Sequence, residues 1–235
     1  MKVVILAIAC LLASVSALPN QQFTELEAAL ITRNNGLITG QIVQQIENVA
    51  QTIRDAGLDP LELDKEIEYA LPVPSILNLK AALRGFLFRG LSNIVVNRMN
   101  YAVLTSRLTF NVELPEIALS VGVADWDVNI FDRNFNGIVS GRVAVKNIVI
   151  AGEVRVSLGV ISGISLRSME VTLNVGNIES NLNVALQGVN YSHHINNYLG
   201  VTVPGTLRAY QSDINELITI VATEVVEKNL LTNLN

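Results

Sequence analysis

The sequence predicts an α+β fold, in which a strongly curved antiparallel β-sheet wraps around a long apolar C-terminal helix. A second helix is expected near the N-terminus. Three observations support this class: apolar and polar residues alternate through the middle of the chain, a period of 3.6 residues appears at both ends, and glycines separate the runs. Half of the 235 residues are hydrophobic and only one is cysteine, so we expect an apolar core rather than disulfides to hold the fold.

Residues 1–17 are typical of a secretory signal peptide. A single lysine precedes an apolar run over residues 3–12, and the small residues Val15-Ser16-Ala17 follow at the expected cleavage site. The run is too short to span a bilayer, so we expect a secreted, extracellular protein rather than a transmembrane one. Cleavage would remove Cys10, the one cysteine, and leave a single domain over residues 18–235.

The first helix is expected over residues 23–56. Within it, Ile42, Ile46, Val49 and Ile53 are spaced by three or four residues and so share one face. A solvated linker is expected over residues 57–75, because its middle is acidic and it ends in Pro72-Val73-Pro74.

The sheet is expected over residues 76–190. Apolar positions alternate from Leu104 to Leu114, as in a half-exposed strand. From Ile117 to Val123 the apolar positions have odd numbers, and from Trp126 to Ile130 they have even numbers. This change near Ala124 predicts one extra residue there, a β-bulge. A second change of the same kind occurs near Asn147.

The last helix is expected over residues 204–231, after Pro204-Gly205. Its apolar face is unusually wide, so the helix must be buried on most of its circumference or line an apolar cavity.

The stretch DRNFNG, residues 132–137, matches the first half of a calcium-binding EF-hand loop. Its twelfth position is Val143, where such a loop needs a bidentate Glu, and its flanks are typical of strands. We therefore predict no metal site but a hairpin tip, for which Asn136-Gly137 is a favourable turn dipeptide.

Other polar motifs do not support catalysis. His193 and His194 would point in opposite directions on an extended chain, Ser192 beside them lacks the partners of a catalytic triad, and no G-x-S-x-G motif is present. Asp125 and Asp127 are expected to be solvent-facing neighbours of Trp126. We expect no enzyme and no cofactor. Asn190-Tyr191-Ser192 is a sequon that would allow glycosylation of Asn190 in a secreted chain.

The formal charge of −5 also limits the partners. An acidic protein with scattered basic residues is not expected to bind nucleic acid or an anionic membrane surface. Few charges, 16% of residues, and many aliphatic side chains suggest apolar surface that faces a ligand.

The order of elements, the stretch ILNLKAALRGFLFRGLSNIVVNRMN (residues 76–100) and the stretch from Asn190 into the last helix resemble the mite group 7 allergens and their insect relatives. That arthropod group belongs with the tubular lipid-binding proteins, beside the bactericidal/permeability-increasing and takeout/juvenile-hormone-binding groups. The resemblance implies an apolar ligand held between the helix and the curved sheet. Hormone-binding members typically carry an N-terminal disulfide, and its absence here favours the group 7 branch over a juvenile hormone ligand.

The resemblance leads us to expect a carrier of a lipid or another small hydrophobic molecule, without catalysis. The alternative is an innate-immune or structural protein that recognises microbial lipids or a protein partner. Periodicity fits a ligand-lined cavity and a filled core equally well, so the sequence leaves both of these interpretations open. If a cavity exists, its candidate lining residues are Leu108, Phe110, Leu217, Ile218, Val221 and Val225.

Overall fold

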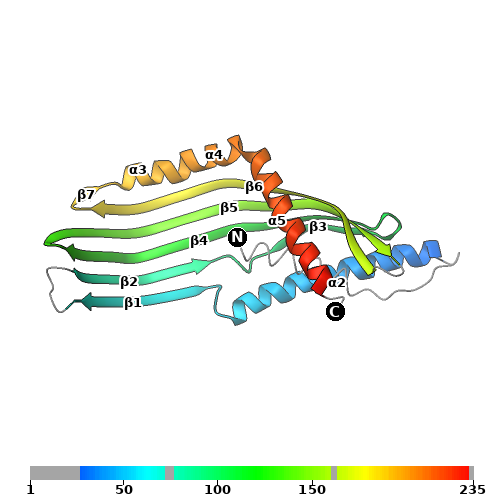
Figure 1. Ribbon diagram of the computed structural model, residues 1–235, viewed down its shortest axis with the longest axis horizontal. Coiled ribbons are helices and arrows are strands. Elements are labelled where there is room, and N and C mark those ends of the chain that lie inside the picture. The colour runs from blue at the N-terminus through cyan, green and yellow to red at the C-terminus, as the bar shows by residue number, and fades with distance from the viewer. Residues whose placement is uncertain (1–26, 72–76, 160–162, 233–235) are drawn as a thin grey trace.

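A computed structural model describes residues 27–71, 77–159 and 163–232. Its elements follow the order helix, strands, helices (Figure 1). The helices and strands are α2 (Glu27–Asp55), β1 (Leu61–Ala70), β2 (Leu77–Arg89), β3 (Val95–Ala102), β4 (Arg107–Ile130), β5 (Arg133–Gly159), β6 (Gly163–Leu186), β7 (Val189–Asn190), α3 (Ser192–Asn197), α4 (Val203–Ala209) and α5 (Gln211–Thr232). A 3₁₀ turn, η1 (Val103–Thr105), precedes β4, and a π-helical turn, η2 (Tyr198–Thr202), joins α3 to α4.

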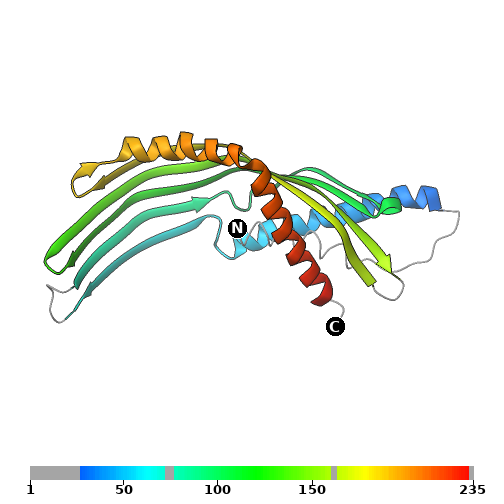
Figure 2. The same cartoon turned by 45° about the horizontal axis from the view of Figure 1, so that its top comes forward.

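The strands form one antiparallel sheet in the order β1-β2-β4-β5-β6-β7, with β3 also paired to β4. β3 pairs with the first part of β4 and β2 with its second part, so both lie along the same edge of that long strand. The sheet is elongated in Figure 1 and clearly curved in Figure 2, with α2 and α5 crossing one half of it. This confirms the predicted fold class, a long curved antiparallel sheet with a helix at each end of the chain.

The β-bulge predicted near Ala124 is confirmed, because the pairing of β4 with β5 shifts by one residue between Val121 and Ala124. Val121 is opposite Gly141 and Ala124 is opposite Val139, two positions that share a face of β5. The extra residue in β4 therefore keeps Trp126 and the apolar positions after it on the face that Val121 occupies.

The hairpin predicted at DRNFNG is present, but its turn lies five residues earlier than Asn136-Gly137. β4 ends at Ile130 and β5 begins at Arg133, so Phe131 and Asp132 form the turn, with φ of 49° and 60°. Positive φ at both positions is what a two-residue hairpin requires. Gly137 lies inside β5 opposite Trp126, where an added Cβ would lie 2.1 Å from the indole ring, so this glycine makes room for the tryptophan.

The prediction of a linker over residues 57–75 is wrong for the middle of that segment, which forms the edge strand β1. Register and charge explain the pairing: Glu66 contacts Arg84 at 2.6 Å and Glu68 contacts Lys80 at 2.8 Å, both across to β2. A charged edge strand also discourages pairing with another chain. The Pro72-Val73-Pro74 stop lies outside the described residues, as does the predicted signal peptide.

The single C-terminal helix predicted over residues 204–231 is two helices, because the helical conformation breaks at Tyr210 between α4 and α5. Helices α3 and α5 protect the free edge of β6. Side chains of the C-terminal segment occupy backbone groups that a further strand would otherwise satisfy. The bonds are Thr219 Oγ1 to the amide of Val171 (3.0 Å), Asn215 Oδ1 to that of Leu173 (3.0 Å), Asn196 Oδ1 to that of Leu182 (2.8 Å) and Ser192 Oγ to that of Val184 (2.9 Å).

Asp59 fixes the segment between α2 and β1 to the loop between β2 and β3. Its buried carboxylate accepts hydrogen bonds from the backbone amides of Gly90 (2.8 Å) and Ser92 (2.5 Å). Burial alone would raise the pKa of Asp59, but the hydrogen bonds from Ser92 and Gly90 and the charge of Arg54 together lower it below the ordinary value of 3.8.

We expect Asp59→Ala to lower the free energy of unfolding by about 1–3 kcal/mol, because two buried amides lose their acceptor. The folded-state pKa is below the unfolded value, so the contribution of Asp59 is present above pH 3.8 and disappears as pH falls through the folded-state pKa. Urea unfolding at neutral and acidic pH would measure this. Asp55→Ala, at an exposed carboxylate on α2, is the control and should change stability by less than about 0.5 kcal/mol. Equal losses in both variants would contradict the assignment.

Candidate ligand-binding site

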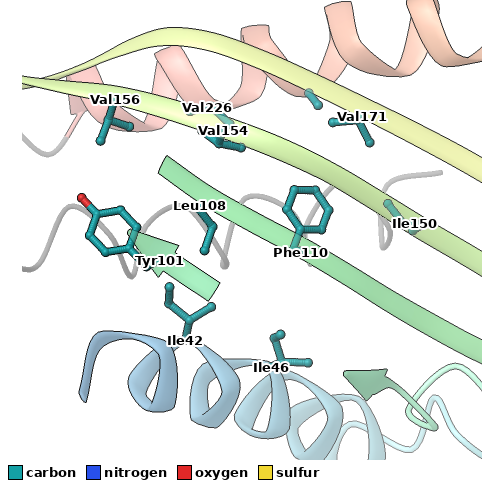
Figure 3. Packing of buried hydrophobic residues seen from close by; sticks show 11 residues of the cluster. Ile42, Ile46, Tyr101, Leu108, Phe110, Ile150, Val154, Val156, Val171 and Val226 are labelled. Carbon is teal, nitrogen blue, oxygen red and sulfur yellow. The ribbon is translucent and has the colours of Figure 1, made fainter. Parts of the chain in front are cut away.

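An apolar layer lies between the sheet and the helices α2 and α5 (Figure 3). We define this layer by its cluster of buried residues, which come from two helices and four strands. They are Ile42, Ile46, Tyr101, Leu108, Phe110, Ile150, Val154, Val156, Val171, Ala222 and Val226.

The α2 side of the layer confirms the helical face predicted from the sequence. Ile42 and Ile46 are 0% and 5% exposed and point toward β3 and β4 in Figure 3. Ile53 is also buried, two turns beyond Ile46 on the same face. The apolar spacing in this helix therefore reports a real packing surface.

The sheet side is centred on Leu108 and Phe110, which occupy the same face of β4 two residues apart. They are 2% and 3% exposed. Gly152 lies opposite Phe110 on β5, and a Cβ there would lie 2.9 Å from the end of the aromatic ring. The glycine thus allows the ring to lie against the backbone of β5.

On α5, the residues buried against the layer overlap with the predicted lining residues only at Ile218. The residues that face the layer are Ala222 and Val226, 2% and 1% exposed, with Ile218 one turn earlier packed against the cluster. Leu217 is 60% exposed and points away from the layer, while Val221 and Val225 are half-buried and are not part of the cluster. Positions 218, 222 and 226 are spaced by four, so they form one stripe, and Leu217 lies about a quarter-turn away from it.

Of the six predicted lining residues, the structure therefore brings together Leu108, Phe110 and Ile218. Contact of these three residues with a ligand stays a prediction. The other members of the cluster were not among the predicted lining residues: Tyr101, Ile150, Val154, Val156, Val171, Ala222 and Val226. All of them except Tyr101 belong to alternating or helical apolar patterns in the sequence, but the apolar face of the last helix is too wide to show which stripe is buried.

The layer carries no charged side chain. Its polar atom is the hydroxyl of Tyr101, and burial raises the pKa of that phenol above its ordinary value of 10.0, with a hydrogen bond to Ser106 acting in the opposite sense. The phenol is therefore neutral at physiological pH. Such an environment can exclude water and bury apolar surface, and it offers no nucleophile or acid–base pair.

A second apolar surface lies on the other face of the sheet, in the half that α2 and α5 leave uncovered. Trp126, Val128 and Phe135 belong to it, since Val128 pairs with Phe135 and Trp126 shares the face of Val128. It is less well enclosed than the layer: Phe135 is 49% exposed and Tyr69, in the same row on β1, is 52% exposed.

The remaining predicted motifs have structural positions. His193 and His194 lie in the helix α3 rather than on an extended chain, with ring centroids 5.8 Å apart, and Ser192 accepts a hydrogen bond from Val184. Asn190 is exposed on β7 and its Oδ1 accepts a bond from the amide of Ser192 at 2.8 Å; its glycosylation stays a prediction.

Over residues 27–71, 77–159 and 163–232, no three His, Cys, Asp or Glu side chains are grouped so that they could hold a metal ion. Within the same ranges, no helix has the length and apolar character needed to cross a membrane.

Two solved structures are similar to this chain. The crystal structure of Epiphyas postvittana Takeout 1 is similar over 84% of this chain and 90% of that chain, with 16% identity and a TM-score of 0.40. The crystal structure of a lipopolysaccharide binding protein is similar over 80% of this chain but only 37% of that one, with 12% identity and a TM-score of 0.27. No curated protein sequence matches the chain. Residues 10–234 match the family described as haemolymph juvenile hormone binding protein (JHBP), and because that match covers nearly the whole sequence, the chain belongs to this family.

Proposed function

We propose that the protein is a secreted carrier that binds a lipid or another small hydrophobic molecule between its sheet and its helices, without catalysing a reaction. The observation that carries this proposal is the apolar layer, which is enclosed by α2, the sheet and α5 and contains no charge. Membership of a family described by hormone binding supports a binding function.

Binding would exchange contacts within the layer for contacts with the ligand. Each Å² of apolar ligand surface removed from water contributes roughly 25 cal/mol, before the costs of association. The break at Tyr210 separates α5 from α4, while Ser192 and Asn196 of α3 are bonded to the edge of β6. A shift of α5 away from the sheet would admit the ligand. This shift would break the bonds of Asn215 and Thr219 to β6 and leave those of α3 intact.

Secretion is inferred from the signal-peptide pattern of residues 1–17. The likeness to the group 7 allergens is inferred from the stretch over residues 76–100 and from the stretch that leads from Asn190 into the last helix.

Organic extraction of the purified protein followed by mass spectrometry tests the proposal. We expect a stoichiometric hydrophobic compound, and uptake of a fluorescent fatty-acid probe after that compound is removed. If no compound co-purifies and the probe is not taken up, a carrier function is contradicted.

Two neighbouring substitutions on α5 locate the binding. Ile218→Asp places a charge against the apolar layer and should lower probe affinity at least tenfold, because the ligand would then bury an ionised group. Leu217→Asp places the same charge on the exposed side of the same helix turn and should leave affinity unchanged. Equal effects of the two variants would contradict binding within the layer. Attachment to bacterial surfaces that Ile218→Asp leaves intact would instead favour recognition of microbial lipids by another surface.

A further inference from the structure

A ring of charged side chains surrounds two buried alanines in the middle of the sheet. Ala118 of β4 and Ala144 of β5 are paired with each other and are each 1% exposed. Of the six residues next to this pair along and across the strands, five are long and charged, and the sixth is Ser120. We call this set the basic ring: Arg89, Glu116, Arg142, Lys146 and Glu179.

The basic ring gathers three cations around one carboxylate. Glu116 lies 2.5 Å from Arg142, 3.7 Å from Arg89 and 4.0 Å from Lys146. Lys146 also contacts Glu179 at 2.7 Å, and this bond lowers the pKa of Glu179. Three cations and two carboxylates leave a formal charge of +1 at this place, although the whole chain carries −5.

One donor of the ring lacks an acceptor. Among the residues that the structure describes, the buried Nε of Arg142 has no hydrogen-bond partner, although the same guanidinium donates to Glu116 through Nη2. A buried N–H without an acceptor is unfavourable, so an additional anionic oxygen at this point would be stabilised.

The ring adjoins the apolar layer. Phe110, Val112, Leu114 and Glu116 alternate along β4 and therefore occupy successive positions on one face of the sheet. Phe110 belongs to the layer, Val112 packs against it and Leu114 is buried. The six steps along the strand from Phe110 to Glu116 span roughly 20 Å, so one extended molecule can reach from the layer to the ring.

We propose that the basic ring binds the anionic head group, a carboxylate or a phosphate, of an amphiphilic ligand whose apolar chain lies in the layer. Arg142 and Lys146 would bind the head-group oxygens, with Arg142 Nε donating the additional hydrogen bond. The side chains are 40% and 32% exposed, so the head group stays in contact with water while the chain is buried. This inference rests on the proposed carrier function and adds the chemical class of ligand.

The test compares ligands of equal chain length and different head group. Calorimetry would measure binding of palmitate, hexadecyl phosphate and uncharged hexadecanol to the full chain. We expect palmitate or the phosphate to bind at least tenfold more tightly than the alcohol, and the tighter of the two identifies the head group. Inorganic phosphate and acetate should not bind measurably, because they lack the chain.

Two variants assign the preference to the ring. Arg142→Gln should reduce affinity for the preferred anion about tenfold and leave hexadecanol unchanged, since a charge-assisted bond is lost. Arg84→Gln, which removes an arginine that is also paired with a glutamate, Glu66, but lies outside the basic ring, is the matched control and should leave both affinities unchanged. Glu116→Gln should act in the opposite direction and strengthen binding of the anion, because it removes the carboxylate that competes for the three cations.

The outcomes separate the two proposals. If neither the acids nor the alcohol bind, the carrier function itself fails and the head-group site fails with it. If all three amphiphiles bind equally, or if Arg142→Gln weakens the alcohol as much as the acid, the carrier function stands and the head-group site is overturned.

Discussion

Val226→Asp is expected to lower the free energy of unfolding by about 3–5 kcal/mol, because it places an unpaired carboxylate in an apolar environment. Val226 is 1% exposed and contacts a cluster to which no charged residue belongs. The largest structural effect should be on α5, whose docking depends on the stripe formed by Ile218, Ala222 and Val226. Chemical denaturation followed by circular dichroism would measure the loss.

The control for this variant is Leu217→Asp on the same helix. Leu217 is 60% exposed, so the same new charge should change stability by less than about 0.5 kcal/mol. Burial also raises the pKa of the introduced carboxyl at position 226, so the stability difference should shrink at acidic pH as that group takes up a proton. A tolerated Val226→Asp with a neutral-pH stability like that of the control would show that α5 does not pack as described.

Phe110→Ala is the second substitution with a large expected effect. The phenyl ring of Phe110 fills the centre of the sheet side of the layer. It lies over Gly152, which has no side chain to fill the space that the ring would leave. We expect a loss of about 3–5 kcal/mol, the range found when a buried aromatic is truncated and leaves a cavity. Thermal or denaturant unfolding would measure this loss.

Phe131→Ala is its matched control, because Phe131 is 73% exposed at the β4–β5 turn. The control should change stability by less than about 0.5 kcal/mol. Similar effects of the two phenylalanine variants would contradict the central place of Phe110 in the core.

Much of the fold follows from periodicity. Alternation through β4 predicts a strand, and the change of parity near Ala124 predicts the bulge that the pairing of Val121 and Ala124 confirms. These features are local, because side chains alternate between the two faces of a strand and the apolar positions therefore show which face is buried. The helical face of Ile42 and Ile46 is predicted for the same reason.

Features that depend on distant partners were not predicted. The acidic residues of β1 look like a linker because the cations that pair with them, Lys80 and Arg84, lie on another strand. Likewise, Asn136-Gly137 has the composition of a turn, but Gly137 serves Trp126, which lies across the hairpin. Tertiary contact outweighs local preference in both cases.

The candidate site shows the same limit. The apolar residues of α5 cover so much of the helix that the sequence alone does not show whether Leu217 or Ile218 faces the sheet. The basic ring is similarly invisible in the sequence, since its five members come from four strands and are brought together only by the register of the sheet.

A crystal structure of the protein purified with its natural ligand tests the central claim most directly. We expect ligand density between α5 and the sheet, in contact with Phe110 and Val226 and extending toward Arg142. Density against Trp126 and Phe135 on the opposite face, or a layer packed by its own side chains in a protein shown to carry ligand, would contradict it.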